Sequence, residues 1–374
     1  MQKNSKHSID IYLLITVIAL VLIGLVMVFS ASSIVAGERF GNPFFFLKRH
    51  IIWLLIGFSA MSAAALFDYS KWHKISFFLV FASICLLTLV LVPGIGIQAG
   101  GARRWFRFGF IGFQPSELAK LAMIIYTASW LDRKQSKISR GFSVYIPKAL
   151  IIAVIVSLIY LEPDLGTSVL LFCVLVTMHF IGGLPYKYLV TIFFMSIPGI
   201  YYGIFNSAYR RRRLFSFLNP WADAKGSGYQ IIQSLLALGT GGITGVGLGN
   251  SKLKLMYLPE AHTDFIYPII AEELGIIGSI GVIILFAYLC YRGVMISLYS
   301  KDFFGKILAF GITVLITYQA IINIAVTTGM LPTKGMTLPF ISFGGSSLVI
   351  TLFAVGILLN ISKYTETKRR EIFQ

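Results

Sequence analysis

The chain consists of long apolar segments separated by polar connections. A helix that crosses a bilayer needs about 20 mainly apolar residues. Ten segments approach this length, namely residues 11–30, 51–67, 75–92, 117–131, 144–161, 165–181, 188–205, 265–291, 303–328 and 346–361. The fourth is short and charged, and the eighth is long enough to be tilted or broken. This pattern predicts an all-α polytopic membrane protein of about ten transmembrane helices.

The composition supports a membrane location. Of the 374 residues, 57% are hydrophobic and 13% are charged, whereas about a quarter of a soluble domain is charged. So many apolar residues cannot be hidden in a water-soluble core. The first apolar segment is too long for a cleaved signal peptide and many spans follow, so we expect an uncleaved helix. The chain shows no repeat and no second domain, so residues 1–374 are expected to form one membrane domain.

The distribution of Lys and Arg predicts the orientation of the chain. Outside the long connection 206–264, the short loops on the side of the N-terminus carry the larger share of these residues, which favours cytoplasmic termini. The connection 206–264 is then extracytoplasmic. Its run Arg210–Arg213 is either a solvated charge run or an anion site at the membrane surface. The net charge of +17 does not indicate nucleic-acid binding, since no soluble basic domain is present.

The strongest candidate for chemistry lies before the eighth apolar segment. Asp264 stands where a helix should begin, so it is either an N-cap or an ionised carboxylate available as a general base or metal ligand. Glu260 and His262 precede it. His262 has no second His or Cys at ligand spacing, so the sequence supports no zinc site.

A second cluster opens the fourth apolar segment. Pro115 suits a first helical turn and Ser116 could cap it. Glu117 and Lys120 are three residues apart and therefore share a helix face. Charges inside a span usually face each other or a polar cavity. The pair is therefore either a structural ion pair or part of a functional site.

Glu272 and Glu273 lie well inside the eighth apolar segment, where a paired structural role is favoured over catalysis. Pro268 stands between them and Asp264, and it predicts a kink in the helix just below Asp264.

Two stretches rich in Gly and Ser complete the candidates. Ser342, Gly344, Gly345 and Ser346 enter the tenth segment, where exposed backbone N–H groups would suit an anion. Residues 239–249 are dense in glycine but lack the Gly-Lys-Ser/Thr of a nucleotide-binding loop. Each stretch either cradles phosphate or simply turns sharply. One carboxylate, many cations and such loops on one side suit a phosphate-bearing substrate anchored in lipid.

Eight strings in these regions resemble a known family. In chain order they are GARRW (101–105), QPSELAK (114–120), PDLGT (163–167), YR with RL (209–214), NPW (219–221), YLPEAHTDF (257–265), EELG (272–275) and PFISFGGSS (339–347). Together they are similar to the SEDS family of shape, elongation, division and sporulation proteins. PEAHTD (259–264) and LPTKGMTLP (331–339) resemble its division branch more than its elongation branch. Leu253, Glu162, Phe343 and Tyr267–Pro268 depart from the usual pattern.

The resemblance implies a peptidoglycan glycosyltransferase that polymerises lipid II at the outer face of the bacterial cytoplasmic membrane, at the division septum. The family's essential aspartate falls on Asp264, and its conserved Glu and Lys fall on Glu117 and Lys120. A class B penicillin-binding protein, with transpeptidase activity, and other division proteins are the implied partners. The residues expected to contact substrate, besides Glu117 and Lys120, are Arg103, Arg210, Arg213, Lys254, Glu260, His262, Ser342, Gly344, Gly345 and Ser346.

The implied reaction is an inverting displacement of lipid diphosphate from a donor sugar. Diphosphate leaves without a proton donor, so one base, Asp264, could suffice where glycosidases need two carboxyls. The diphosphate would be held by Arg103, Arg210, Arg213, Lys254 or a divalent cation, Mg or Mn. Two alternatives remain open at this stage, a flippase for a lipid-linked precursor and a non-catalytic division scaffold.

Overall fold

The computed structural model describes residues 9–99, 101–109, 111–135, 146–252 and 262–372. These residues form the helices α1 Ile11–Phe40, α2 Phe45–Leu66, α3 Ser70–Leu91, α4 Pro115–Lys134, α5 Ile146–Leu161, α6 Leu165–Ile181, α7 Tyr186–Phe205, α8 Ala208–Leu218, α9 Tyr229–Thr240, α10 Ile266–Leu298, α11 Phe303–Thr327 and α12 Gly345–Ile372. A 3₁₀ turn, η3, covers Pro220–Asp223.

Each of the ten predicted apolar segments coincides closely with one helix, so the prediction of a polytopic α-helical membrane protein is confirmed. Within the described residues, seven helices are long and apolar enough to cross a membrane, and α5 and α6 are shorter apolar helices. The remaining helix that matches a predicted segment, α4, carries the charged pair in its first turns. Helices α8 and α9 are additional elements of the connection 206–264.

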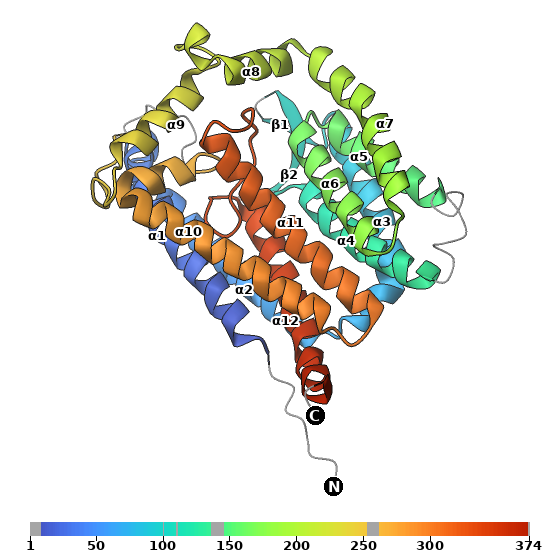
Figure 1. Ribbon diagram of the computed structural model, residues 1–374. Helices are drawn as coiled ribbons and strands as arrows, with labels where there is room; N and C mark the ends of the chain where they lie inside the picture. The colour runs from blue at the N-terminus through green and yellow to red at the C-terminus, as the bar shows by residue number, and fades with distance from the viewer. Residues whose placement is uncertain (1–8, 100, 110, 136–145, 253–261, 373–374) are drawn as a thin grey trace.

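The long helices form one bundle with both termini at the same end (Figure 1). Helix α12 packs mainly against α2, α10 against α11 and α1, and α3 against α4. In α12 the buried face includes Leu352, Val355 and Leu358, so this helix lies in the core of the bundle. At the opposite end lie α8, α9, the strands and the start of α10 (Figure 1). We call this the distal end.

A small sheet at the distal end was not predicted. Strands β1 Ile97–Ala99, β2 Ala102–Phe108 and β3 Ile111–Phe113 connect α3 to α4. They form an antiparallel sheet in the order β1-β2-β3. The strands are short and separated by glycines, so they contain no long apolar run that would predict them from the sequence. The sheet nevertheless matters, because it carries arginines to the mouth of the site.

Helix α10 is broken, as its length suggested, but at Gly275 rather than at Pro268. Gly275 has φ 66° and ψ −163°, a conformation open only to glycine. Pro268 lies in the first turn of α10, where a missing N–H breaks no helical hydrogen bond. The predicted kink at Pro268 is therefore wrong, and the cause of the break lies in the segment that packs against it.

The glycine-dense stretch 239–249 fills the break. The N–H groups of Val246 and Gly247 donate to the carbonyls of Glu272 (2.9 Å) and Glu273 (3.1 Å). The N–H of Ile276 donates in turn to the carbonyl of Gly242, at 2.9 Å. The backbones approach so closely that a Cβ at Gly245 would lie 2.2 Å from the Glu273 carbonyl. Of the two interpretations of this stretch, the structure supports a tight turn that satisfies a broken helix.

The carboxylates of Glu272 and Glu273 hold neighbouring segments in place. Both side chains are buried. Glu272 accepts hydrogen bonds from the Ser251 hydroxyl and from the Lys252 N–H, the latter at 3.0 Å. Glu273 accepts from the Ser30 hydroxyl at 2.7 Å. These contacts tie α1 and residues 251–252 to the distal half of α10, which is the structural role that the sequence favoured.

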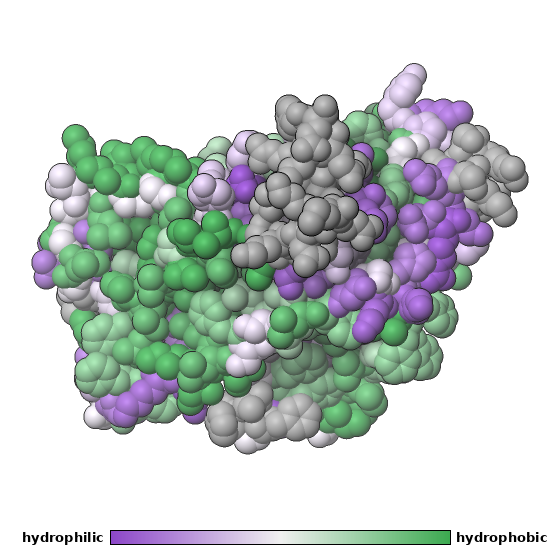
Figure 2. Space-filling model, turned by 90° about the horizontal axis from the view of Figure 1, so that it is seen from below, coloured by the Kyte–Doolittle hydropathy of each residue, from purple (hydrophilic) through white to green (hydrophobic). Residues whose placement is uncertain are grey.

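The end that carries the termini is shown in Figure 2. Hydrophilic residues gather on one side of this face, while hydrophobic residues cover much of the rest. Exposed cations at the ends of α3 and α4 and between α10 and α11 include Lys71, Lys74, Arg133 and Lys301. Such a distribution suits a membrane surface, where Lys and Arg meet lipid headgroups.

Candidate functional site

A cavity of about 520 Å³ opens at the distal end. Its lining combines residues from α2, β2, α4, α6, α8, α11 and the segments before α10 and α12. Among the lining residues are the cations Arg49, Arg104, Arg107, Lys120 and Arg213 and the acids Glu117, Asp164 and Asp264. The cavity therefore brings together charges that are far apart in the sequence.

Asp264 lies in this lining, two residues before the first residue of α10. Phe265 occupies the N-cap position of the helix, so the interpretation of Asp264 as the N-cap is wrong. One carboxylate oxygen accepts a hydrogen bond from the Thr263 hydroxyl at 2.9 Å. Gly335 is a neighbour of the other oxygen, since a Cβ added at Gly335 would lie in ordinary van der Waals contact with it, at 3.7 Å. The carboxylate is thus partly buried but borders the cavity.

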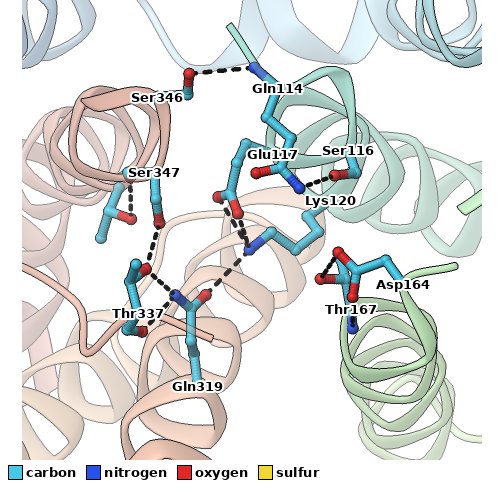
Figure 3. Close-up of polar contacts among 11 residues, drawn as sticks. Gln114, Ser116, Glu117, Lys120, Asp164, Thr167, Gln319, Thr337, Ser346 and Ser347 are labelled. Atoms are coloured by element: carbon cyan, nitrogen blue, oxygen red, sulfur yellow. Dashed lines mark hydrogen bonds and ion pairs between the residues drawn. The ribbon is translucent and has the colours of Figure 1, made fainter. Parts of the chain in front are cut away.

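Glu117 and Lys120 form the predicted ion pair on α4 (Figure 3). The Lys120 ammonium lies 3.0 Å from each Glu117 oxygen. Only 8% of Glu117 and 3% of Lys120 is exposed, so the pair is buried at the deep end of the cavity. Pro115 begins α4, as predicted, but Gln114 takes the N-cap position, so the cap assigned to Ser116 is wrong.

Gln319 of α11 extends this pair into a network (Figure 3). Its carbonyl oxygen accepts from Lys120 at 3.0 Å, and its amide nitrogen donates to the Thr337 carbonyl at 3.0 Å. The Thr337 hydroxyl continues to Ser347 at 3.2 Å. The network thereby holds α4, α11, the segment before α12, and α12 around the Lys120 ammonium.

Arg104 connects the sheet to the α5–α6 junction. Its guanidinium donates to the carbonyls of Glu162 and Pro163, each at 2.7 Å, and lies 4.0 Å from Asp164. Asp164 in turn caps α6 by accepting from the Thr167 N–H at 3.0 Å. Arg104 therefore places positive charge at the cavity through contacts that also fix the local fold.

The other arginines are held less extensively. Arg213 donates to the Thr333 carbonyl at 3.1 Å and stacks on Tyr209. Arg49 lies over the ring of Phe45, 4.3 Å from its centroid. Arg107 is exposed at the cavity lining. These guanidinium groups are complementary to phosphate oxygens in both geometry and charge.

The structure separates the predicted site residues into three groups. Those that line the cavity are Asp264, Glu117, Lys120, Arg213, Gly344 and Gly345. Those outside its lining are Arg103, Arg210, His262, Ser342 and Ser346. Lys254 and Glu260 lie outside the described residues, and their expected roles stay predictions.

Several of the second group make contacts that stabilise the fold. Arg210 donates to the Gly203 carbonyl at 2.7 Å and stacks on Tyr160. The Ser346 hydroxyl bridges β3 and α4, donating to Gly112 at 2.8 Å and accepting from the Gln114 N–H at 3.1 Å.

Ser342 and His262, which also lie outside the cavity lining, stabilise the segment between α11 and α12. Ser342 accepts from the Leu338 N–H at 2.8 Å. The ring of His262 packs on Phe46, with ring centroids 4.4 Å apart. Its carbonyl accepts from the Phe343 N–H at 2.9 Å.

Sequence reasoning missed Arg49, Arg104, Arg107, Asp164, Gln319 and Thr337 as members of the lining. Arg104 was within a string that we singled out, but the choice between it and its neighbour Arg103 depends on how β2 is oriented. Gln319 carried a signal that was overlooked, since a polar amide inside a transmembrane helix usually faces a partner.

The described residues do not form a metal site from protein ligands alone, because no three His, Cys, Asp or Glu side chains cluster among them. Glu117 is paired with Lys120, and Asp164 caps a helix. Protein Mg²⁺ sites often use one or two carboxylates with substrate phosphates. A requirement for Mg or Mn therefore stays a prediction for experiment.

Two ionisable groups near the cavity are perturbed by burial. Burial raises the pKa of Glu162 to about 8, the Asp164 charge adds to this, and Arg104 opposes it. Both oxygens of Glu162 lack a hydrogen-bond partner within the described part of the chain. Burial lowers the pKa of Lys334, and the nearby Asp164 acts in the opposite direction.

The fold and the cavity together define a polytopic membrane protein with a charged site at one end of the bundle. The sequence model of the FtsW, RodA and SpoVE family, described as cell cycle proteins, matches residues 11–367. The chain therefore belongs to this family, and the resemblance drawn from its motifs is confirmed.

Relatives extend over nearly the whole chain. A probable peptidoglycan glycosyltransferase FtsW of Geobacter metallireducens is 46% identical over 353 residues, which is 94% of each chain. Stage V sporulation protein E of Bacillus subtilis is 42% identical over 362 residues, covering 97% of this chain and 99% of that protein.

Solved structures share the fold. A chain from a peptidoglycan synthase complex superposes with a TM-score of 0.79 and 29% identity, covering 95% of this chain and 97% of that chain. The rod shape determining protein RodA of Thermus thermophilus superposes with a TM-score of 0.70 and 27% identity, covering 96% and 97%.

Proposed function

We propose that this chain is a peptidoglycan glycosyltransferase that polymerises lipid II into glycan strands at the outer face of the bacterial cytoplasmic membrane during cell division. One observation carries the proposal. The carboxylate of Asp264 shares a cavity of about 520 Å³ with five cationic side chains, at the distal end of the bundle. The names of the relatives that cover nearly the whole chain support the same activity.

The distal end is proposed to face outwards. Both termini lie at the other end, whose short loops carry the Lys and Arg excess typical of the cytoplasmic side. Lipid II exposes its sugars at the outer surface, while its polyprenyl chain stays in the bilayer. A cavity at the outer end of the helices is accessible to such a substrate.

In the proposed reaction, Asp264 is the general base. The 4-hydroxyl of an acceptor GlcNAc attacks the anomeric carbon of a donor MurNAc. The new C–O bond forms as the bond from that carbon to the diphosphate oxygen breaks. Asp264 takes the hydroxyl proton, and the electron pair of the broken bond leaves with polyprenyl diphosphate. Attack from the opposite face inverts an α-linked donor to a β-linked product.

The arginines of the cavity supply the charge that the leaving group needs. Arg49, Arg107 and Arg213 border the cavity, whereas the charge of Lys120 is already balanced by Glu117. Guanidinium groups bind phosphate oxygens in a bidentate manner and stabilise the negative charge that develops there. Lipid diphosphate would therefore leave as an anion held by arginine.

The proposed partner is a class B penicillin-binding protein, the transpeptidase that crosslinks new strands, together with other division proteins at the septum. One structural neighbour comes from a peptidoglycan synthase complex that coordinates polymerisation and crosslinking. Its similarity over 95% of this chain supports such an assembly for this chain too.

The central test is Asp264→Asn in purified protein supplied with lipid II. Asparagine keeps the shape of the side chain but cannot accept the proton, so glycan polymerisation should fall by at least about 10²-fold. Asp302→Asn is the matched control, because Asp302 caps α11 at the end that carries the termini. An Asp264→Asn protein that polymerises as fast as the control would overturn the assignment.

Liposomes reconstituted with the protein separate the alternatives. Polymerisation creates a glycosidic bond that gel electrophoresis of the glycan detects, whereas a flippase moves labelled lipid II without making that bond. If the protein were only a scaffold, cells carrying Asp264→Asn would divide normally.

A further inference from the structure

Behind Asp264 lies an asparagine that does not border the cavity. Asn323 of α11 is 1% exposed. Its amide nitrogen donates to the carbonyl of Asp264 at 2.9 Å and to the carbonyl of Met336 at 2.7 Å. Both partners are acceptors, so the orientation of the amide follows from the chemistry, and both of its hydrogens are used.

These two carbonyls belong to the two chain segments that flank the carboxylate. One segment ends at Asp264 and leads into α10. The other contains Gly335, whose backbone approaches the Asp264 carboxylate. Both segments are irregular in backbone conformation, so helical hydrogen bonds do not fix their separation. Beside the backbone hydrogen bond from the Phe343 N–H to the His262 carbonyl, the buried Asn323 side chain thus joins the two walls of the site next to Asp264 itself.

One turn earlier on the same face of α11, Gln319 makes an equivalent connection. Its amide nitrogen donates to the Thr337 carbonyl, and its oxygen accepts from Lys120. The two amides therefore attach consecutive residues, Met336 and Thr337, to one helix. A buried amide in a transmembrane helix is unfavourable unless its polar atoms are paired. The nitrogens of both amides are paired in this way, whereas the Asn323 oxygen has no hydrogen-bond partner within the described part of the chain.

We infer that Asn323 is a positioning residue for Asp264, which it holds by its main chain so that the carboxylate stays at the reacting hydroxyl. The inference rests on the proposed function. Asn323 acts through Asp264 and touches no substrate. A displacement of about 1 Å can lower a rate about 10²-fold, even when it originates away from the chemistry.

The chain offers a matched control in Asn360 of α12, which is 2% exposed. Its amide nitrogen donates to the Ala65 carbonyl at 2.8 Å, and its oxygen accepts from the Tyr69 N–H at 2.9 Å. Replacing either asparagine by leucine therefore removes two hydrogen bonds from a buried site. The Ala65 carbonyl would still accept from the Lys363 ammonium, whereas the Tyr69 N–H would lose the Asn360 side chain. Only Asn323 is near Asp264.

The experiment compares Asn323→Leu with Asn360→Leu in purified protein and lipid II. Both variants should lose thermal stability to a similar extent. Asn323→Leu should lower kcat about 10²-fold with KM for lipid II changed less than about threefold, since binding groups are untouched. Asn360→Leu should keep kcat near the wild-type value. Rates are normalised to the monodisperse fraction in size-exclusion chromatography.

A second variant guards against misfolding. Asn323→Ser retains one donor, and it should give a kcat between those of wild type and Asn323→Leu. In an Asp264→Asn background, Asn323→Leu should lower the residual rate less than about threefold, because the group through which it acts is gone.

The outcomes are distinct. If Asn323→Leu and Asn323→Ser keep the kcat of Asn360→Leu while Asp264→Asn is inactive, the positioning role is refuted and the proposed function stands. If Asp264→Asn is fully active, the proposed function itself fails.

Discussion

The buried pair Glu117–Lys120 allows stability and activity to be separated. In Lys120→Met the Glu117 carboxylate would remain buried without its cation, which lies 3.0 Å away in the native protein. Removal of one partner from a buried ion pair costs about 3–5 kcal/mol. Gln319 would also lose the charged donor to its carbonyl oxygen, and hydrogen bonds to charged groups contribute about 1.5–3 kcal/mol. Lys120→Met should therefore be strongly destabilised.

The double variant Glu117→Gln/Lys120→Met removes both charges at once. The cost of a single removal comes from the charge that is left unpaired, and replacement of a whole buried pair by hydrophobic residues of similar volume is often neutral. Gln and Met leave no unpaired charge, so the double variant should recover most of the loss. Polymerisation should nevertheless stay at least about 10²-fold low, because both side chains line the cavity and we propose that they contact substrate.

The assay has two parts. The midpoint of SDS-induced unfolding in mixed micelles reports stability, and glycan synthesis from lipid II reports activity. Wild-type activity in the stable double variant would show that the pair only supports the fold. A Lys120→Met protein with wild-type stability would refute the reasoning on burial.

Three further predictions concern other parts of the molecule. A Gly→Ala change in the middle of an ordinary helix stabilises it by about 0.5–1 kcal/mol. At Gly275, however, φ is 66° and the new Cβ would lie 2.4 Å from the Gly245 nitrogen, so Gly275→Ala should lower the free energy of unfolding by about 1–3 kcal/mol or more. A variant more stable than wild type would contradict the break at Gly275. Burial raises the pKa of Glu162 from 4.5 to about 8, so the folded state keeps a proton that the unfolded state releases, and stability present below pH 4.5 is lost as pH rises to about 8. Glu162→Gln should therefore raise Tm by an amount that grows from pH 5 to about pH 8 and then levels off, and a difference that stays constant from pH 5 to pH 8 would contradict the shift. Chelation with EDTA should slow polymerisation less than Asp264→Asn does, because arginines in the cavity already offer charge to the diphosphate; a complete loss, restored by Mg²⁺ or Mn²⁺, would assign that task to a metal.

The helices could be predicted because the bilayer acts on each segment independently. A run of apolar residues must span lipid whatever its neighbours do. The interruption of α10 shows the limit of this reasoning. Length alone suggested a break, but the break was assigned to Pro268 because proline acts locally. It occurs at Gly275, where residues 242–247 replace the missing helical hydrogen bonds.

The residues of the candidate site show the same difference between what local sequence predicts and what packing decides. Asp264 and the pair Glu117–Lys120 were found because an ionised group in or beside an apolar helix is unusual on its own. Arg103 was chosen in place of Arg104, since the direction of each side chain depends on the pairing of β2. Ser346 was interpreted as an anion ligand, yet its hydroxyl joins β3 to α4.

Membrane insertion, the number and limits of the long helices, and the residue types capable of chemistry all follow from the order of residues, because each depends on local hydropathy or local charge. The cavity depends instead on how segments from positions 49 to 347 pack together. Asn323 illustrates the difference. An amide inside an apolar helix indicates some polar partner, as it does for Gln319, but does not say which one. The relation of Asn323 to Asp264 exists only because folding brings α11 against the start of α10.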